Sequence, residues 1–418
     1  MDRKLADDII ERLRFGRPPQ RGVNAYTAGN EEFLQQVQRR HLNPASGGRG
    51  KIRFVSGSWG SGKSHFLRQL REVAFGANYM VSFVELTRDE TPFDKFEEVF
   101  YQIVRQVTSP EMYNEDCTDT ASPLGEVFRR HLFGADHDAS TVPREKHDQA
   151  VESLMSDSQI DIDVRRLIVK YWETFLPEAG DSFMLVDKRE RIMQWFSGEG
   201  TIGQYRKEFG VQKLVNRSNA KLLLKSLARY ITHVGYSGLV ILFDEAEMGY
   251  SVMKRSQLKN AHNNILHLIN SIEDNEGLFL VYATTPDFYV DEKFGVVTYG
   301  ALAQRVGRPE DRPPRALDRL WNIDQLQASL EDYEAAAKKI RTIYLAAYSD
   351  GESVISSEDD LPTFVDDLHD AHPKYSQQGF WRVLVAATVH RFDLELEGEP
   401  VPSVEELHDE IIEKLREE

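Results

Sequence analysis

The chain has 418 residues, of which 41% are hydrophobic, enough for more than one hydrophobic core. Its formal net charge is −17, from 51 basic and 68 acidic residues, and this acidic balance argues against a protein dedicated to coating DNA. The single cysteine, Cys117, excludes an intramolecular disulfide and a cysteine-rich zinc site. No apolar run approaches the roughly 20 residues of a membrane helix, and the charged N-terminus lacks an apolar signal segment. We therefore expect a cytoplasmic protein that does not enter a membrane.

The hydrophobic periodicity predicts helices that alternate with short apolar strands. In chain order we predict a helix over 4–14, a helix from about 30, a strand over 51–56, a helix over 64–75, a strand over 79–86, a helix over 92–107, a helix over 222–232, a strand over 238–243, a helix over 260–272, a strand over 278–284 and a short strand over 320–323. Residues 108–218 show scattered helical patterns and no strong strand. From residue 326 onward the pattern is helical, over 330–348, 361–369, 378–390 and 404–416. Strands that alternate with helices predict an α/β fold with a parallel sheet.

The strongest motif is a glycine-rich loop between the first predicted strand and a helix. The loop reads Gly57-Ser58-Trp59-Gly60-Ser61-Gly62-Lys63-Ser64 and fits the P-loop pattern G-x-x-x-x-G-K-[ST]. Glycines allow the backbone to wrap closely around phosphates, and the N–H groups at the helix N-terminus face the anion. Lys63 is predicted to contact the β- and γ-phosphates, and the Ser64 hydroxyl to ligate Mg²⁺. His65 follows directly and is grouped with the nucleotide-binding residues. The motif predicts that the chain binds ATP with magnesium.

Two acidic residues follow the strand predicted over 238–243. The segment Leu239-Val240-Ile241-Leu242-Phe243 is entirely apolar and is followed by Asp244 and Glu245. Ligands of open α/β sheets bind at the carboxyl ends of the strands, where this pair would lie. We expect Asp244 to hold magnesium and Glu245 to act as the general base on the attacking water. Glu247, two residues later, fits a salt-bridge or loop residue better.

Two hydroxyl side chains, Thr284 and Thr285, end the strand predicted over 278–284. Either side chain is suited to hydrogen-bond the γ-phosphate or the attacking water, and we favour Thr285 slightly over Thr284. The alternative is that the two threonines only cap the turn before Pro286. A guanine-reading Asn-Lys-x-Asp element, a metal-spaced cluster of His, Cys and Asp, and a Gly-x-Ser-x-Gly element are all missing from the sequence.

Two locally basic stretches interrupt the acidic composition. They are residues 12–21, with four arginines, and residues 305–319, with five. These side chains are candidates for a few phosphate contacts with DNA, which would weaken steeply with salt. The alternative is that they serve ATP phosphates or surface ion pairs. We therefore expect at most weak DNA contact.

Taken together, Lys63, the adjacent acids and the polar end of the next strand resemble the AAA-like branch of P-loop ATPases. The segment from Arg21 to Glu31 resembles the stretch that packs on adenine in that branch. The resemblance implies that Arg305, after the strand that carries the threonines, reaches the ATP of a neighbouring subunit in a homo-oligomer. It also implies that Arg382, which opens a C-terminal helix, is a second sensor arginine. An ordinary surface ion pair is the alternative for each arginine.

More narrowly, the chain resembles the P-loop ATP-binding proteins of BREX-type phage-exclusion systems over roughly residues 5–390. The resembling features are the Asp7-Asp8-Ile9-Ile10 opening, the Pro18 to Gly29 segment, the Gly57-Ser58-Trp59-Gly60 form of the loop and the Asp244-Glu245-Ala246-Glu247 cluster. The expected domains are an N-terminal helical and adenine-contacting segment (1–50), the first half of an ATPase core (51–107), a helical insertion (108–218), the second half of the core (219–325) and a helical C-terminal domain (326–418).

This resemblance implies an ATPase of a bacterial or archaeal anti-phage system, which uses hydrolysis to remodel or regulate a DNA-associated complex with other defence proteins. Two alternatives remain open from the sequence. One is an ATP-gated scaffold that hydrolyses slowly and signals by its conformation. The other is a nucleotide or small-molecule kinase, which the helical C-terminal region disfavours.

Overall fold

The structure is a computed structural model that describes residues 1–417 apart from 44–49, 88–91, 116–121, 135–140, 181, 247–249, 251–252, 273–274, 327, 352 and 374–378. Cys117 and Glu247 lie outside the described residues. The strands are β1 (Lys51–Ser56), β2 (Tyr79–Glu85), β3 (Val107–Thr108), β4 (Gly238–Asp244), β5 (Leu278–Thr284) and β6 (Leu320–Asn322). The five predicted strands are confirmed, each to within one residue at both ends, and the α/β class is confirmed with them.

The helices before β4 are α1 (Arg3–Arg14), α2 (Glu31–His41), α3 (Lys63–Gly76), α4 (Phe96–Gln106), α5 (Pro110–Asn114), α6 (Pro123–Phe133), α7 (Arg144–Ser156), α8 (Ile162–Trp172), α9 (Ser182–Phe196), α10 (Ile202–Phe209) and α11 (Ala220–His233). Those after β4 are α12 (Arg255–Ile272), α13 (Asp287–Val290), α14 (Gly300–Val306), α15 (Leu330–Ala347), α16 (Leu361–Ala371), α17 (Phe380–Glu397) and α18 (Val404–Glu417). The short 3-10 helix η6 (Ile323–Gln325) follows β6 directly.

The sheet has the strand order β3-β2-β4-β5-β1-β6. Strand β4 pairs in parallel with β2, where Glu85 is opposite Asp244, and with β5, where Phe243 is opposite Tyr282. All seven residues of β4 and of β5 are buried, as expected for central strands of a sheet covered on both faces. The expectation of a purely parallel sheet is wrong at the edge, because β3 pairs antiparallel with β2. Helix α4 connects β2 to β3, and β3 follows it directly as a strand of only two residues.

The predicted start of the fourth helix at Pro92 is also wrong, because α4 begins at Phe96. Residues 92–95 form a turn in which the Lys95 N–H donates to the Pro92 carbonyl at 2.9 Å. The ring of Phe93 packs edge-on against Phe243 and Tyr282, with centroids 5.7 and 5.5 Å away. This packing of Phe93 against the ends of β4 and β5 favours a turn where local propensity favours a helix.

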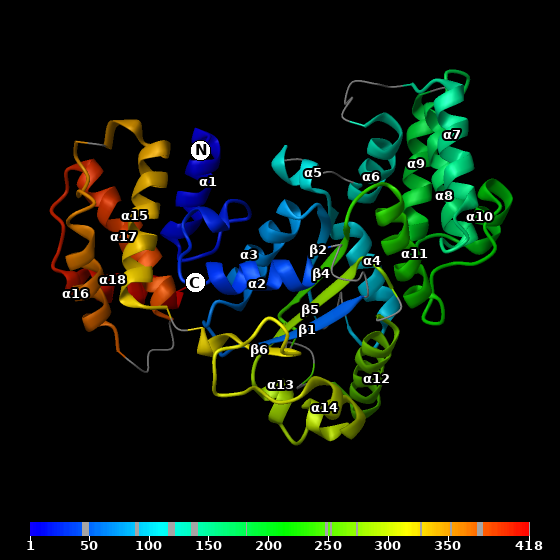
Figure 1. The fold of residues 1–418 in the computed structure, drawn as a ribbon. Coiled ribbons are helices and arrows are strands. Elements are labelled where there is room, and N and C mark those ends of the chain that lie inside the picture. The colour runs from blue at the N-terminus through cyan, green and yellow to red at the C-terminus, as the bar shows by residue number, and fades with distance from the viewer. Residues whose placement is uncertain are drawn as a thin grey trace. The chain divides into compact units, whose positions relative to one another are not determined.

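The chain divides into two compact units. The first unit comprises Met1–Val37, Val55–Val73 and Pro309–Glu418, and the second comprises Gln38–Phe54 and Ala74–Arg308. In the first unit, α1 packs with α15, α16, α17 and α18 around one apolar core that includes Ile10, Ile340 and Leu384 (Figure 1). Arg14 of α1 donates to Asp393 of α17 at 2.7 and 2.9 Å, and this contact ties the N-terminal helix to the C-terminal helices.

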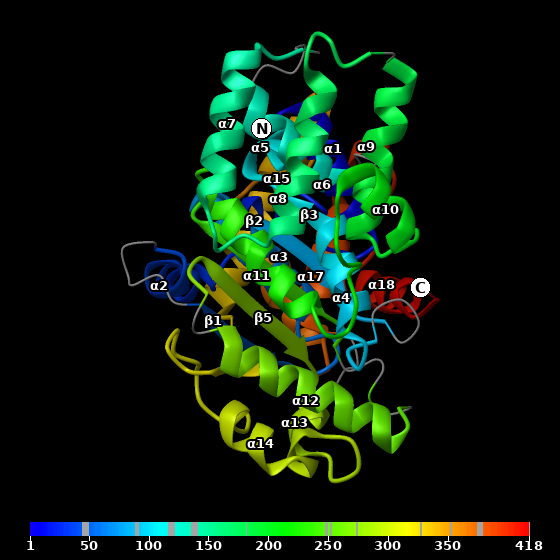
Figure 2. The same cartoon turned by 90° about the vertical axis from the view of Figure 1, so that its right-hand side faces the viewer.

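In the second unit, α6 to α10 form a helical layer between β3 and α11, and α8 packs against α7 and α9 (Figure 2). Residues 109–180 and 182–218 contain no strand where the structure describes them. The layer has its own aromatic core, in which Trp172 and Trp195 are fully buried. Among the described residues, no helix is long and apolar enough to span a membrane.

Two histidines in the second unit, the half-buried His131 and the buried His262, make its stability depend on pH. The ring of His131 accepts or donates a hydrogen bond with the Tyr230 hydroxyl at 3.1 Å, and burial together with nearby His233 lowers the pKa of His131 to about 4. Burial lowers the pKa of His262 to about 4 as well. An unfolded histidine titrates near 6.5, so the unfolded chain gains protons in acid before the folded chain does. The stabilising contribution is therefore complete above pH ~6.5 and is lost as the pH falls toward ~4.

We expect the melting temperature to fall when the pH is lowered from about 7.5 to about 5. The pKa of His65 in the first unit is lowered to about 4 as well, so the variant His131→Asn lacks one of three such rings and its melting temperature should fall less over the same interval. The exposed His267 on α12 is the control, and His267→Asn should leave the pH dependence as it is in the wild type. Equal melting temperatures at the two pH values would contradict this account.

Candidate functional site

The glycine-rich loop lies between β1 and α3, where the sequence predicts it. Gly60 and Gly62 have φ of +75° and +87°, a left-handed backbone that favours glycine. At Gly57 a Cβ atom would lie 2.8 Å from Cγ1 of Ile323, so a side chain there would displace the residue after β6. The three glycines therefore permit a tight turn that leads directly into the N-terminus of α3. An N-terminus with this preceding loop is a site suited to phosphate.

Lys63 is the first residue of α3, and its side chain folds back over the loop. Its Nζ atom donates to the carbonyl oxygens of Gly57 at 2.9 Å and Ser58 at 3.1 Å. The residue is only 9% exposed, whereas Trp59 in the same loop is 67% exposed. The ammonium lies 5.5 Å from the centroid of the Trp59 ring. The cation is thus held inside the curve of the loop, where a bound phosphate needs it.

Side chains of α3 anchor the segment that the sequence assigns to adenine. The Glu72 carboxylate accepts hydrogen bonds from the N–H groups of Val23 at 2.8 Å and Asn24 at 3.0 Å. The Arg68 guanidinium donates to the Pro18 carbonyl at 2.7 Å, and Asn30 donates to Gln69. Every contact here joins residues 18–30 to the helix that begins with Lys63. The segment and the loop are therefore positioned by one rigid element.

His65 lies beside this segment. Its Nδ1 atom is 3.1 Å from the Tyr26 hydroxyl, and the two rings meet edge-on with centroids 5.5 Å apart. Burial and the neighbouring Arg68 lower the pKa of His65 to about 4, and burial raises the pKa of Tyr26. Both side chains are therefore neutral at physiological pH and present an uncharged edge next to Ser64.

The two acids lie at the carboxyl end of β4 in the second unit. Asp244 is 2% exposed, and its Oδ1 atom accepts a hydrogen bond from the N–H of Glu245 at 3.0 Å. Glu245 is exposed and has a φ of +51°, one of two non-glycine residues with positive φ among the described residues. Such a conformation costs about 1–3 kcal/mol and is concentrated at functional sites. The strand thus ends in a buried carboxylate followed by an exposed one on a strained backbone.

The threonines at the end of β5 differ from each other in their surroundings. Thr284 is fully buried, and its hydroxyl has no hydrogen-bond partner in the described part of the structure. Thr285 is 4% exposed, and its carbonyl accepts the N–H of Phe288 in the turn that leads to α13. A buried hydroxyl without a partner is unusual, and it makes Thr284 a good candidate for contact with a ligand.

The predicted site residues are divided between the two units. The first contains residues 57–65 and Arg382 near the start of α17. The second contains Asp244, Glu245, the two threonines and Arg305, which is exposed on α14. The turn before α17 lies close to the loop, because a Cβ at Gly379 would be 2.5 Å from the Gly60 carbonyl oxygen. Arg382 therefore lies one helical turn from a residue that contacts the loop.

Comparison with known families assigns the chain. The family model of the BREX system ATP-binding protein BrxC/D matches residues 1–377. The chain belongs to this family. Membership gives it an ATP-binding role in a phage-defence system. No curated protein and no solved structure matches the chain.

The match to the BrxC/D family includes the glycine-rich loop, the acids after β4, the threonines after β5 and Arg305. It ends before α17, so Arg382 lies beyond the matched residues. The residues present fit ATP with magnesium. In the first unit the loop curves around Lys63 and carries the Ser64 hydroxyl, an oxygen ligand of the kind that Mg²⁺ prefers. In the second unit, taken by itself, the Asp244 carboxylate is another oxygen ligand of this kind, and the Thr284 hydroxyl has no hydrogen-bond partner among the described residues. Where the structure describes the chain, no group of three or more His, Cys, Asp or Glu residues forms a dedicated metal site.

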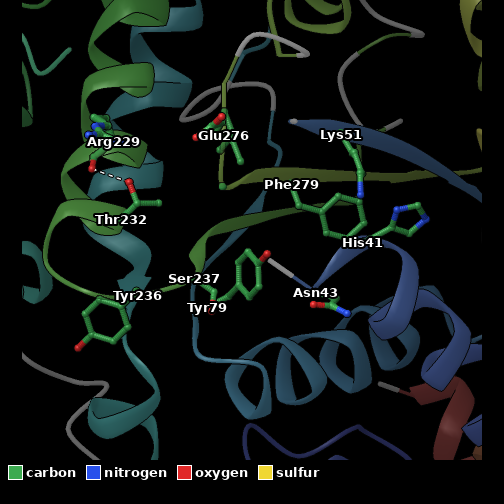
Figure 3. A pocket seen from close by; sticks show the side chains of 12 residues that line it. His41, Asn43, Lys51, Tyr79, Arg229, Thr232, Tyr236, Ser237, Glu276 and Phe279 are labelled. Carbon is green, nitrogen blue, oxygen red and sulfur yellow. Dashed lines mark hydrogen bonds between the residues drawn. The ribbon is translucent and has the colours of Figure 1, made fainter. Parts of the chain in front are cut away.

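The second unit of this family member contains a pocket of about 240 Å³, and Figure 3 shows the side chains that line it. Its lining includes Lys51, Tyr79 and Leu278, the first residues of β1, β2 and β5, so it lies at the strand starts, whereas Asp244 ends β4. Lys51 Nζ donates to the Arg40 carbonyl at the end of α2, at 2.7 Å, and Arg229 pairs with Asp157 at 2.8 Å. These cations therefore stabilise helix ends and helix contacts, and the pocket includes neither of the two acids.

Sequence reasoning missed two residues that contact the nucleotide-binding elements. Glu72 holds the N-terminal segment, and Asp324 after β6 binds the N–H of Ser58 at 3.0 Å. Glu72 has a detectable signal, since Arg68, Gln69 and Glu72 place polar groups on one face of a helix whose other face is apolar. Asp324 has no such signal, because only the tertiary fold brings it to the loop.

Proposed function

We propose that this BREX family member hydrolyses ATP at a P-loop site of the AAA-like type. Bound Mg-ATP would supply the phosphoryl group and the metal that neutralises its charge. The loop amides from Gly57 to Ser64 would bind the phosphates, with Lys63 as the main cation. Ser64 and Asp244 would hold the magnesium ion. His65 and the segment around Tyr26 would face the base.

The observation that carries hydrolysis, beyond ATP binding, is the backbone of Glu245. Glu245 has a φ of +51° and directly follows the buried Asp244. Two adjacent residues therefore place one carboxylate in the interior and the other at the surface. This arrangement supports a division of roles, in which Asp244 faces the metal and Glu245 accepts a proton from water. Strand β5 lies between β4 and β1 in the strand order, which supports a sensor role for Thr284 or Thr285.

In a defence system, we propose that hydrolysis remodels or regulates a complex that assembles on DNA, with a homo-oligomer of this chain and other defence proteins as partners. The net charge of −17 supports only weak DNA contact by the isolated protein. The test is ATP hydrolysis measured over a range of protein concentrations, with and without duplex DNA. Steady release of phosphate supports the ATPase. Stoichiometric retention of ATP without turnover would replace it with the slow ATP-gated scaffold, and phosphorylation of a metabolite would indicate a kinase.

Removing the loop lysine should abolish most ATP binding. In Lys63→Ala the phosphates lose their main cation, and hydrogen bonds to charged groups contribute about 1.5–3 kcal/mol, so affinity should fall about ten- to hundredfold. Isothermal titration calorimetry with ATP and magnesium measures this directly. Lys259→Ala, which changes an exposed lysine on α12, is the control and should bind as the wild type does. Unchanged affinity in Lys63→Ala would place the phosphates elsewhere.

A further inference from the structure

Asp324 makes an unexpected set of contacts with the glycine-rich loop. Both of its carboxylate oxygens lie 3.0 Å from the backbone nitrogen of Ser58, which donates to them. The Ser58 hydroxyl also donates to Oδ2, at 2.8 Å. The two residues are 266 positions apart, and both belong to the first unit. One carboxylate thus binds both the backbone and the side chain of the second residue of the loop.

The element that carries Asp324 fits closely against the start of the loop. Asp324 lies in η6, and the Asn322 side chain caps this short helix by accepting the N–H of Asp324 at 3.3 Å. The preceding Ile323 fills the space where Gly57 lacks a side chain. The segment after β6 therefore contacts the first two residues of the loop in order, Ile323 on Gly57 and Asp324 on Ser58.

Ser58 is also a contact of the loop lysine. Its N–H group points to Asp324, and its carbonyl oxygen accepts a hydrogen bond from Lys63 Nζ at 3.1 Å. The peptide groups on both sides of Ser58 are therefore fixed, one by an anion and the other by a cation. A rotation of Ser58 that broke the first contact would also move an acceptor that holds the ammonium of Lys63.

We propose that Asp324 is a positioning residue for ATP, which acts through Ser58 to hold Lys63 in the phosphate-binding geometry. The proposal rests on the proposed nucleotide site at this loop. Asp324 does not contact the phosphates in this arrangement. Its carboxylate fixes the backbone at Ser58 before ATP binds. ATP binding therefore costs less conformational entropy, because this part of the loop is already ordered. Because η6 leads toward α15, the same contact joins the loop to the helices of the first unit.

The decisive experiment measures ATP affinity in Asp324→Asn by calorimetry and compares KM with kcat. The amide keeps the shape but has no charge and only one acceptor oxygen, so we expect about a tenfold loss of affinity, the size typical of a hydrogen bond to a charged group. KM should rise by a similar factor while kcat changes by less than about threefold. The reason is that the lost contact stabilises the bound ground state and the transition state equally. Ser58→Ala removes only the hydroxyl contact and should weaken ATP about threefold. The ATP affinity of the double variant should lie within about twofold of that of Asp324→Asn alone, because both substitutions disrupt the same contact between Asp324 and Ser58.

Asp318→Asn is the matched control. Asp318 lies six residues earlier and accepts hydrogen bonds from Arg312 and from the N–H of Arg315, both at 2.8 Å. This variant should bind ATP as the wild type does. Affinity within about twofold of the wild type in both Asp324→Asn and Ser58→Ala would overturn the proposal, and so would independent, additive losses. If Asp324→Asn melts below the assay temperature, Ser58→Ala decides alone. Failure of the wild type to bind ATP would instead overturn the proposed nucleotide site itself.

Discussion

Glu245→Gln should bind ATP as tightly as the wild type and nearly stop hydrolysing it. The amide has the same shape as the carboxylate but cannot accept the proton of the attacking water. Loss of a general base typically lowers the rate by about 10² to 10⁴. Phosphate release in single-turnover conditions measures the rate, and calorimetry measures ATP affinity in the same preparation. Because the two residues are separated by one peptide bond, Asp244 should still hold magnesium in this variant.

The matched control for this variant is Glu85→Gln. Glu85 ends β2, is exposed and lies opposite Asp244 in the register of the sheet, so it is another carboxylate at the same edge. Its amide variant should hydrolyse ATP at the wild-type rate. Wild-type turnover in Glu245→Gln would show that another group is the base. Glu247, which lies outside the described residues, would be the next residue to test.

Arg305→Ala should abolish the dependence of hydrolysis on protein concentration. If Arg305 completes the site of a neighbouring subunit, activity per subunit in the wild type should rise as the oligomer forms. A guanidinium that stabilises the charge of the transferred phosphoryl group is worth about 10³ to 10⁵ in rate in GTPases. Arg305 lies near the end of α14 and is exposed, as a group that acts on another subunit must be. ATP binding should stay close to that of the wild type.

Mixing two inactive variants tests whether the arginine acts between subunits. Arg305→Ala has an intact ATP pocket, and Lys63→Ala has an intact arginine, so a mixture should recover part of the activity that each lacks alone. The control is Arg308→Ala, which changes an exposed arginine just after α14 and should keep the concentration dependence. Wild-type activity that is independent of concentration, together with a monomer by light scattering in ATP, would contradict the proposal. Arg305 would then be a surface ion-pair residue.

The local elements of this protein follow from its sequence. Strands β1, β4 and β5 are short apolar runs between polar turns, and their buried positions leave little choice of structure, so their bounds agree with the periodicity to within a residue. The glycine-rich loop is equally local. Its spacing requires left-handed backbone at Gly60 and Gly62, and only glycine adopts that conformation without strain. The resemblance to the BREX family was also read from local sequence, including the Asp7-Asp8-Ile9-Ile10 opening and the Asp244-Glu245-Ala246-Glu247 cluster, and the family model confirms it.

Only the tertiary structure determines which residues far apart in the chain contact each other. Periodicity shows that α1 has an apolar face but not that this face packs against α15 and α17, more than 300 residues later. The late start of α4 depends on Phe93 reaching the ends of two strands, and the antiparallel β3 depends on a free sheet edge. Asp324 is an ordinary acid in the sequence and acquires a role only when β6 brings it to Ser58. Sequence patterns record the burial of each residue, whereas the partner that buries or binds it is set by chain topology.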